Sequence, residues 1–118
     1  MDQTQQQIIE YYDTFYAAEG FRYYPPAFTR AVLRSLLRKA RVSAGARVLD
    51  VGCATGYYSA ILSALGCEVT GIDISETGIR KAREQYPFIR FEVQDATALP
   101  YPSGSFDFVF ALGVSVAN

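Results

Sequence analysis

Three aspartates, Asp50, Asp73 and Asp95, stand where short apolar runs of the sequence end. Each run has the length and composition of a buried parallel strand. The carboxyl ends of parallel strands share one edge of a sheet, and ligands of open α/β sheets bind in the crevice outside that edge. We therefore expect the three carboxylates to converge on one rim. There Asp73, 23 residues after Asp50, would suit the ribose hydroxyls of a nucleotide-like ligand.

A turn of small residues follows the first apolar run, from Gly52 to Gly56. Apolar side chains then recur at helical spacing from Tyr57 to Leu65, so the turn should open a helix whose free N–H groups point toward the strand end. Glycines lack a Cβ and would let the backbone approach a ligand closely. The same residues would also suit a turn that only joins a strand to a helix, but the neighbouring aspartates favour a ligand cradle.

The order of the expected elements predicts an α/β domain. We expect strands at residues 48–51, 68–75, 89–93 and 106–112, and helices at 5–18, 25–40, 57–65 and 76–86. Right-handed crossovers would arrange the strands in the order 3-2-1-4, with the ligand crevice between strands one and four. The nearly continuous apolarity of the fourth strand predicts that both its faces are covered. The expected fold is a Rossmann-like, doubly wound, mostly parallel sheet.

Composition limits the classes of function. The chain has 118 residues, half of them apolar, and a formal net charge of −1, which predicts a soluble domain without general attraction to nucleic acid or anionic membranes. No run approaches a membrane span and residues 1–7 are too polar for a signal peptide, so we expect a cytoplasmic protein. Cys53 and Cys67 lack metal-ligand spacing and the sequence has no histidine, so we expect reduced thiols and no metal site.

Positive charge is concentrated in residues 21–49, which contain seven Arg or Lys residues and no acid. Most of these cations belong to the helix expected at 25–40. A solvated helix face would account for them, with the last cations complementing the helix C-terminus. A site for an acidic substrate or partner is the alternative, although no nucleic-acid recognition motif accompanies it. The residues expected on the buried side of this helix are Phe28, Val32, Leu33, Leu36 and Leu37.

The motifs, taken in order, resemble those of class I S-adenosylmethionine-dependent methyltransferases, most closely the small-molecule type 11 branch. The resemblance covers residues 44–118, and the ordered set is far more specific than any one motif. The matching segments are VLDVGCATG (48–56), VTGIDIS (69–75), QDATALPYPSGSFDFVF (94–110) and ALGVSVAN (111–118).

The resemblance implies a set of residues that bind the cofactor S-adenosyl-L-methionine. Those around its methionine part would be Asp50, Gly52, Cys53, Ala54 and Gly56. Those at the ribose and adenine would be Asp73, Ile74, Asp95 and Ala96, with Asp73 on the ribose hydroxyls. Leu112 and Gly113 would border the methyl group. Ala54 replaces the usual middle glycine of the family, which brings a methyl group close to the cofactor, and we expect this departure to be tolerated.

The resemblance also divides the chain into two parts. Residues 1–43 would form N-terminal helices, comprising a tyrosine-bearing lid and a first sheet-covering helix. Residues 44–118 would form the cofactor-binding half, truncated after the fourth strand. The family's sheet continues with three more strands, without which the fourth strand is an exposed apolar edge. We expect a fragment of a longer protein, or a homo-oligomer or partner chain that covers this strand.

The chemistry implied by this cofactor is direct in-line methyl transfer to a small-molecule acceptor. The sulfonium leaving group is already activated, so alignment and exclusion of water can supply most of the acceleration. We assign no catalytic residue. A non-catalytic cofactor-binding or regulatory module that needs a partner chain is the alternative. A nicotinamide-dependent oxidoreductase is disfavoured because the G-x-G-x-x-G positions hold Gly52, Ala54 and Tyr57.

Overall fold

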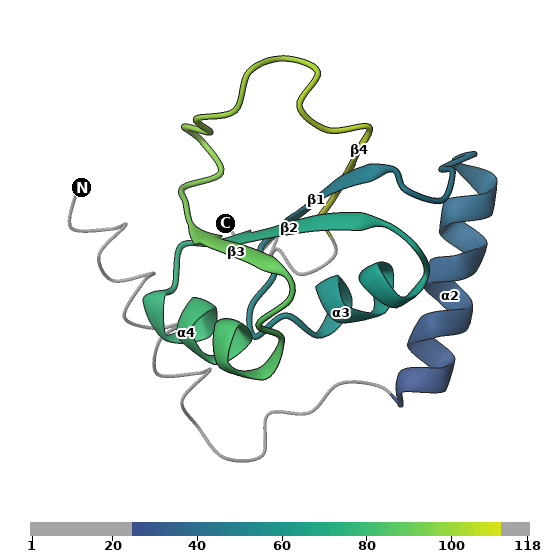
Figure 1. Ribbon diagram of the computed structural model, residues 1–118, viewed down its shortest axis with the longest axis horizontal. Coiled ribbons are helices and arrows are strands. Elements are labelled where there is room, and N and C mark those ends of the chain that lie inside the picture. Colours follow the sequence, from purple (N-terminus) through teal and green to yellow (C-terminus); the bar gives the residue numbers. More distant parts are fainter. Residues whose placement is uncertain (1–24, 112–118) are drawn as a thin grey trace.

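The computed structural model describes residues 25–111 (Figure 1). All its strands pair in parallel in the order β3-β2-β1-β4, which confirms the predicted sheet and strand order. The helix and the tyrosines expected before residue 25 lie outside the described residues, as do Leu112 and Gly113. The elements are α2 (Pro26–Lys39), β1 (Arg47–Val51), α3 (Tyr57–Ala64), β2 (Glu68–Asp73), α4 (Glu76–Gln85), β3 (Arg90–Val93) and β4 (Phe108–Phe110).

Local signals in the sequence set the helix boundaries. Pro26 occupies the first position of α2, where a missing N–H costs nothing. Ser75 caps α4, because its Oγ accepts a hydrogen bond of 3.0 Å from the N–H of Gly78. Gly66, with φ +100°, follows α3 and turns the chain toward β2. The helices therefore begin and end close to their predicted positions.

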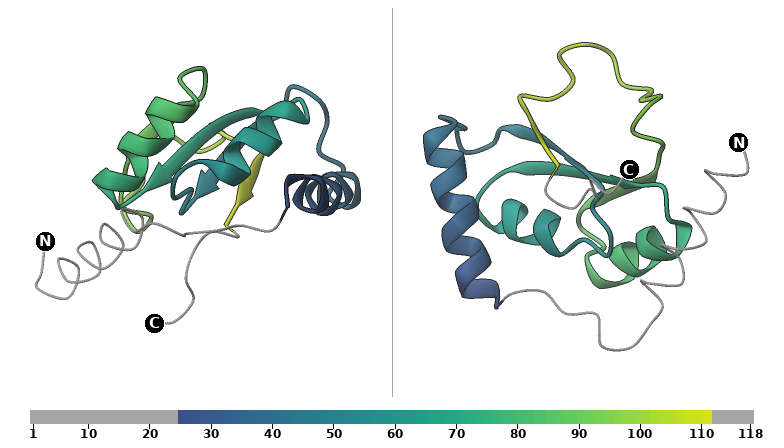
Figure 2. Two further views of the ribbon diagram at one scale, coloured as in Figure 1. Left: turned by 90° about the horizontal axis from the view of Figure 1, so that it is seen from below. Right: turned by 180° about the vertical axis from the view of Figure 1, so that it is seen from behind.

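The helices α3 and α4 lie on one side of the strands, and the long loop from residue 94 to 107 lies on the other (Figures 1 and 2). Side chains alternate between the faces of a strand. The ring of Phe110 faces α3, 6.1 Å from the ring of Tyr58. On the opposite face Tyr101 of the loop donates a hydrogen bond to the carboxylate of Glu92. This contact ties the loop to β3.

The core between the sheet and its helices depends on two glycines beneath the ring of Phe91. A Cβ added at Gly71 would lie 2.6 Å from Cδ1 of the Phe91 ring, and one added at Gly56 would lie 2.8 Å from Cζ of the same ring. Real Cβ atoms do not approach so closely, so these positions need glycine for Phe91 to pack against β2 and the start of α3. The largest apolar side chains that are almost fully buried are Leu33, Val48, Leu49, Leu62, Ile72 and Ile79.

The predicted buried side of α2 was partly wrong. Leu33 and Leu37 are buried as expected, but Phe28, Val32 and Leu36 are 59%, 39% and 40% exposed. The buried stripe is narrow because α2 packs beside α3 at the end of the layer rather than flat on the sheet.

The predicted coverage of the fourth strand was also wrong. The strand is three residues long, and Val109 at its centre is 57% exposed. Because the adjacent Phe110 faces α3, alternation along the strand places Val109, the partner of Leu49, on the opposite face. The described helices do not cover that face at β4.

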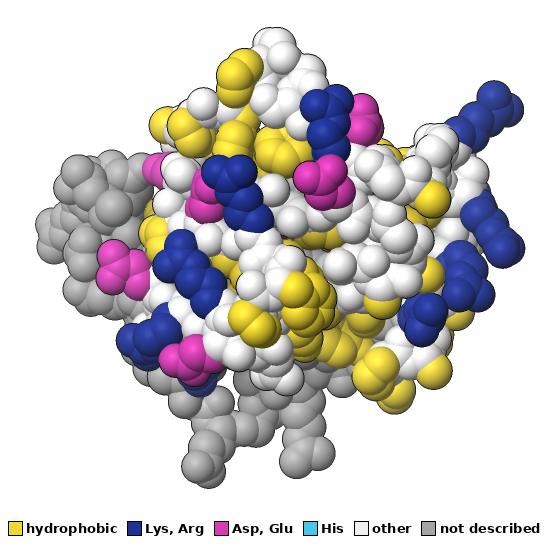
Figure 3. All heavy atoms as spheres, in the orientation of Figure 1, with side chains coloured by type: hydrophobic (Ala, Val, Ile, Leu, Met, Phe, Trp, Pro, Cys, Tyr) yellow, Lys and Arg dark blue, Asp and Glu magenta, His cyan; other side chains and the backbone are white. Residues whose placement is uncertain are grey.

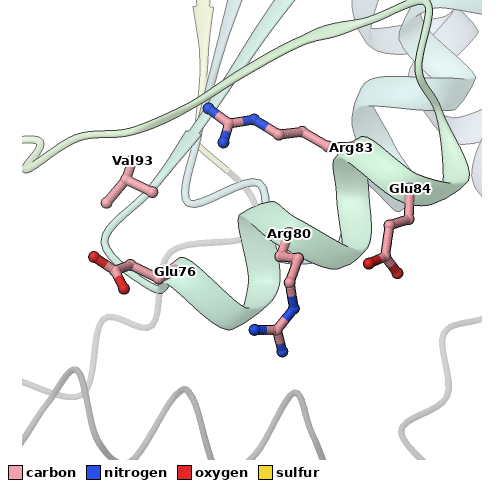
Figure 4. A pocket seen from close by; sticks show the side chains of 5 residues that line it. All are labelled: Glu76, Arg80, Arg83, Glu84 and Val93. Carbon is pink, nitrogen blue, oxygen red and sulfur yellow. The ribbon is translucent and has the colours of Figure 1, made fainter.

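The strand β3 lies at one edge of the described sheet, and a guanidinium occupies its outer side. Arg83 of α4 donates from Nε and Nη2 to the carbonyl oxygen of Phe91, at 3.2 and 2.9 Å. Figure 4 shows Arg83 reaching toward the strand while Arg80, which lines the same groove, points away from it. An unpaired carbonyl at a strand edge can accept a hydrogen bond from another chain. Arg83 therefore blocks strand addition at β3.

Replacing Arg83 with Ala should increase concentration-dependent self-association, because it frees the Phe91 carbonyl at the edge of β3. Sedimentation velocity over a range of concentrations would measure the effect. Arg80→Ala removes an equal charge from the same helix and groove and is the matched control. Equal self-association of the two variants would show that net charge, rather than edge protection, controls assembly.

Candidate functional site

The turn between β1 and α3 is fastened to the end of β2. The N–H groups of Gly52 and Cys53 both donate to the carbonyl oxygen of Ile72, each at 2.9 Å. The turn closes with a 2.9 Å bond from the Gly56 N–H to the Cys53 carbonyl. Gly52, Ala54 and Gly56 all have positive φ, at +74°, +52° and +91°. The result is a tight loop that delivers the N-terminus of α3 directly to the carboxyl ends of the two central strands.

Asp73 braces this turn from the end of β2. One carboxylate oxygen accepts the N–H of Ala54 at 2.8 Å, and the other accepts the N–H of Ser75 at 2.9 Å. The residue is 6% exposed. An ionised carboxylate is an acceptor only, with about four lone-pair sites on its two oxygens. The structure thus gives Asp73 a structural duty, and its contact with ribose hydroxyls stays a prediction.

Asp50 lies fully buried under the same turn. Its Oδ2 accepts a 2.7 Å hydrogen bond from the hydroxyl of Ser59 on α3, whereas its Oδ1 is buried without a hydrogen-bond partner. Burial raises the pKa of Asp50 to about 7, against the effect of the Ser59 bond and with a further contribution from the Asp73 charge. A buried acceptor without a partner is costly, and a cationic donor bound beside it would relieve that cost.

Asp95 is placed differently from the other two aspartates. It begins the loop beyond β3, and its Oδ1 accepts bonds from the N–H and hydroxyl of Thr97, at 2.9 and 2.7 Å. Both bonds lower the pKa of Asp95, and the bond from the N–H has the larger effect. The adjacent Gln94 N–H donates to the Asp73 carbonyl at 3.0 Å, which holds the end of β3 beside β2.

The structure therefore brings together part of the predicted set. Asp73 is hydrogen-bonded to the turn of residues 52–56, and Asp50, two residues before that turn, is bonded to Ser59 of the helix that the turn opens. Asp95 lies in the loop that follows β3. Ile74, which follows Asp73, is half-buried, and Ala96, which follows Asp95, is exposed. The binding roles of all these residues remain predictions.

Sequence reasoning missed Ser59. It lies fully buried on α3, and it holds one oxygen of Asp50. The sequence offers two serines on this helix, Ser59 and Ser63, and does not show which of them faces the sheet.

The two cysteines are free and buried, at 1% exposure for Cys53 and 8% for Cys67. Burial raises the pKa of both thiols, which keeps them protonated and poorly nucleophilic. Within residues 25–111, no three potential ligands from His, Cys, Asp or Glu gather closely enough to hold a metal ion. No helix in this described range has the length and apolarity needed to cross a bilayer.

A parallel sheet in the order 3-2-1-4, with a small-residue turn and acids at the ends of its central strands, defines a Rossmann-like cofactor-binding domain. The profile of a protein family described as a methyltransferase domain matches residues 48–117. The chain belongs to this family.

Named relatives agree with this placement. The chain is 46% identical over 72 residues to a 2-methyl-6-phytyl-1,4-hydroquinone methyltransferase from Synechocystis, with 58% of this chain and 23% of the relative covered. It is 42% identical over 72 residues to a malonyl-[acyl-carrier protein] O-methyltransferase from Erwinia pyrifoliae, covering 61% and 28%. The chain thus spans about a quarter of the length of these relatives. A SAM-dependent methyltransferase from Methanosarcina mazei superposes with a TM-score of 0.58 at 30% identity, covering 62% of this chain and 39% of that one.

Replacing Asp50 with Asn should change how stability depends on pH. An acid whose pKa rises on folding makes the folded state less stable as pH increases from about 4 to about 7, because the folded state then binds more protons than the unfolded state. The variant should lack this loss, on the order of a few kcal/mol, so its free energy of unfolding relative to wild type should increase between pH 4 and 8. Urea denaturation across this range measures the difference. Glu84→Gln, at an exposed site, is the control, and a pH-independent difference for Asp50→Asn would contradict the expectation.

Replacing Ala54 with Gly should increase the free energy of unfolding by about 0.5 kcal/mol. The left-handed backbone at φ +52° strains an alanine by about 1 kcal/mol, and the greater freedom of glycine in the unfolded chain offsets part of the gain. Ala60→Gly inside α3 is the matched control, and it should lower the free energy by about 1 kcal/mol. Equal losses from the two substitutions in urea titrations would show that Ala54 is not strained.

Proposed function

We propose that the protein binds S-adenosyl-L-methionine at the turn of residues 52–56 and takes part in direct in-line methyl transfer to a small-molecule acceptor. The observation that carries this proposal is the partnerless buried oxygen of Asp50, on the strand that leads into a fastened, glycine-bearing turn. The methionine part of this cofactor has an ammonium group, which is the type of donor that such an oxygen lacks. The residues present therefore fit the cofactor.

The cofactor-binding residues in this proposal are those implied by the family resemblance. Asp50 and the turn would hold the methionine part, and the carboxylate of Asp73 would accept hydrogen bonds from the ribose hydroxyls. Ile74, Asp95 and Ala96 would contact the adenine, and Leu112 and Gly113 would border the methyl group. When bound, the cofactor supplies an activated methyl group on a sulfonium. The work of the protein residues is then to orient the reactants and to exclude water.

The acceptor is proposed only as a class. One relative is named for a hydroquinone acceptor and another for a malonyl group on a carrier protein. Because the relatives are named for different acceptors, the segment that they share with this chain does not specify one acceptor. We infer a small-molecule acceptor, direct displacement without a covalent intermediate, and a cytoplasmic location, for which the two free cysteines are support.

Isothermal titration with S-adenosylhomocysteine tests cofactor binding. The chain should bind it with micromolar affinity, and Asp73→Asn should weaken binding at least about tenfold, or roughly 1.4 kcal/mol. Asp107→Asn is the matched control, because Asp107 pairs with Arg47 at the start of β1, at the end of the strand away from the turn. The affinity of this variant for S-adenosylhomocysteine should stay within about twofold of wild type. Urea denaturation of each variant would confirm folding. Wild-type affinity in a folded Asp73→Asn variant would refute the assignment of Asp73.

A methyl-release assay separates the enzyme from a non-catalytic binding module. Radiolabelled cofactor is incubated with the chain and a hydroquinone acceptor, and methylated product is extracted. Turnover above the level without protein supports methyl transfer. Tight cofactor binding with no turnover across acceptor classes, together with a stable partner chain on size exclusion, would instead support the binding module.

A further inference from the structure

The charges of this chain are separated along the sequence. Residues 21–49 hold seven cations and no acid, whereas the rest of the chain holds four cations and twelve acids, a difference of +7 against −8. In Figure 3 the dark blue side chains over α2 gather along one side of the molecule with yellow side chains next to them, and the magenta side chains lie elsewhere. The described cations of this group are Arg30, Arg34, Arg38, Lys39, Arg41 and Arg47.

Arg30, Arg34 and Arg38, called the basic row, lie at four-residue intervals on α2 and are all exposed. The described structure contains no ion pair to any of the three. Like charges four residues apart disfavour a helix by about 0.2–0.5 kcal/mol per pair. The helix C-terminus favours the cation at position 38, but Arg30 and Arg34 are too far from it to benefit. The fold alone therefore gives no stabilising reason for Arg30 and Arg34.

A second exposed row on α2 is apolar. Phe28, Val32 and Leu36, called the apolar row, also lie at four-residue intervals and are 39–59% exposed. At 100° per residue, the two rows flank the buried side of the helix, and its outward surface lies between them. Residues 27, 31 and 35 occupy this outward surface and are small, so a second helix can approach closely. The outer side of α2 thus has cations along one margin, apolar side chains along the other and small residues between them.

We propose that the outer side of α2 docks an acidic amphipathic helix of a partner protein. Carboxylates at four-residue intervals on such a helix would repeat about every 6 Å, the same step as the guanidiniums of the basic row. Arginine and carboxylate can then pair through two hydrogen bonds each. Apolar side chains on the adjacent side of the partner helix would cover the apolar row, as in other helix-in-groove complexes.

The surface fits a helix better than it fits a nucleic acid. A phosphate backbone would satisfy the basic row but would leave the apolar row against a charged strand. The excess of acids over the rest of the chain would also repel a long polyanion. A second copy of the chain offers acids too, which makes self-association an outcome that the experiment must detect.

Binding of a synthetic peptide tests this inference. The probe is a peptide of about 20 residues with glutamates and leucines at four-residue intervals on neighbouring faces, long enough to be helical. Fluorescence anisotropy should show binding that weakens as salt is raised. Arg30→Gln with Arg34→Gln should weaken binding at least about tenfold, and Val32→Ser with Leu36→Ser should also weaken it. Arg80→Gln on α4 is the matched control and should leave the affinity unchanged. These positions are exposed, and circular dichroism would confirm that each variant folds.

Four results would overturn the inference. The first is no peptide binding at low salt. The second is equal binding of a peptide with glutamine at each glutamate position. The third is tighter binding of duplex DNA than of the peptide, unaffected by loss of the apolar row. The fourth is self-association of the chain that Arg30→Gln with Arg34→Gln abolishes, since a second copy would then be the occupant. None of these readouts depends on cofactor binding, so failure here leaves the proposed function standing.

Discussion

The site depends on the bond network that joins the turn after β1 to the end of β2. Two N–H groups of the turn meet one carbonyl, that of Ile72, and a third meets the carboxylate of Asp73. The same carboxylate holds Ser75, whose hydroxyl caps α4. Two strands and the starts of two helices are thus fixed relative to one another by a few buried polar groups. A buried hydrogen bond is costly to leave unmade, so this network specifies one arrangement of the turn.

Two residues in or next to this network, Asp50 and Ala54, are in energetically unfavourable states. Asp50 is buried with one oxygen unpartnered, and Ala54 holds a backbone conformation that suits glycine. Neither feature improves packing, and both lie within a few residues of each other. Local violations of good packing and backbone geometry cluster at functional sites. Both features are local costs that the packing of Phe91 on Gly56 and Gly71 does not remove, and the proposed ligand would compensate the cost at Asp50.

The sequence was informative wherever the signal is local. Apolar runs, the serine at position 75 and the proline at 26 were enough to place the elements and the order of strands. The pairing of Asp50 with Ser59 could not be read in this way, because it depends on how α3 rotates over β1. The brace at Asp73 uses backbone donors, which every residue except proline carries, so no residue type signals it. Phe28, Val32 and Leu36 of α2 were wrongly predicted to be buried. An apolar pattern shows which side chains can be buried, but the area that the neighbouring helix α3 covers determines which of them are buried.

The contact between the guanidinium of Arg83 and the edge of β3 affects the sheet as a whole. Because the Phe91 carbonyl is already engaged at one margin, addition of a strand is disfavoured there relative to the other margin, where β4 has no strand beside it among the described residues. Growth of the sheet is thus biased toward one side. A segment that adds on that side pairs with residues 108–110, away from the guanidinium of Arg83.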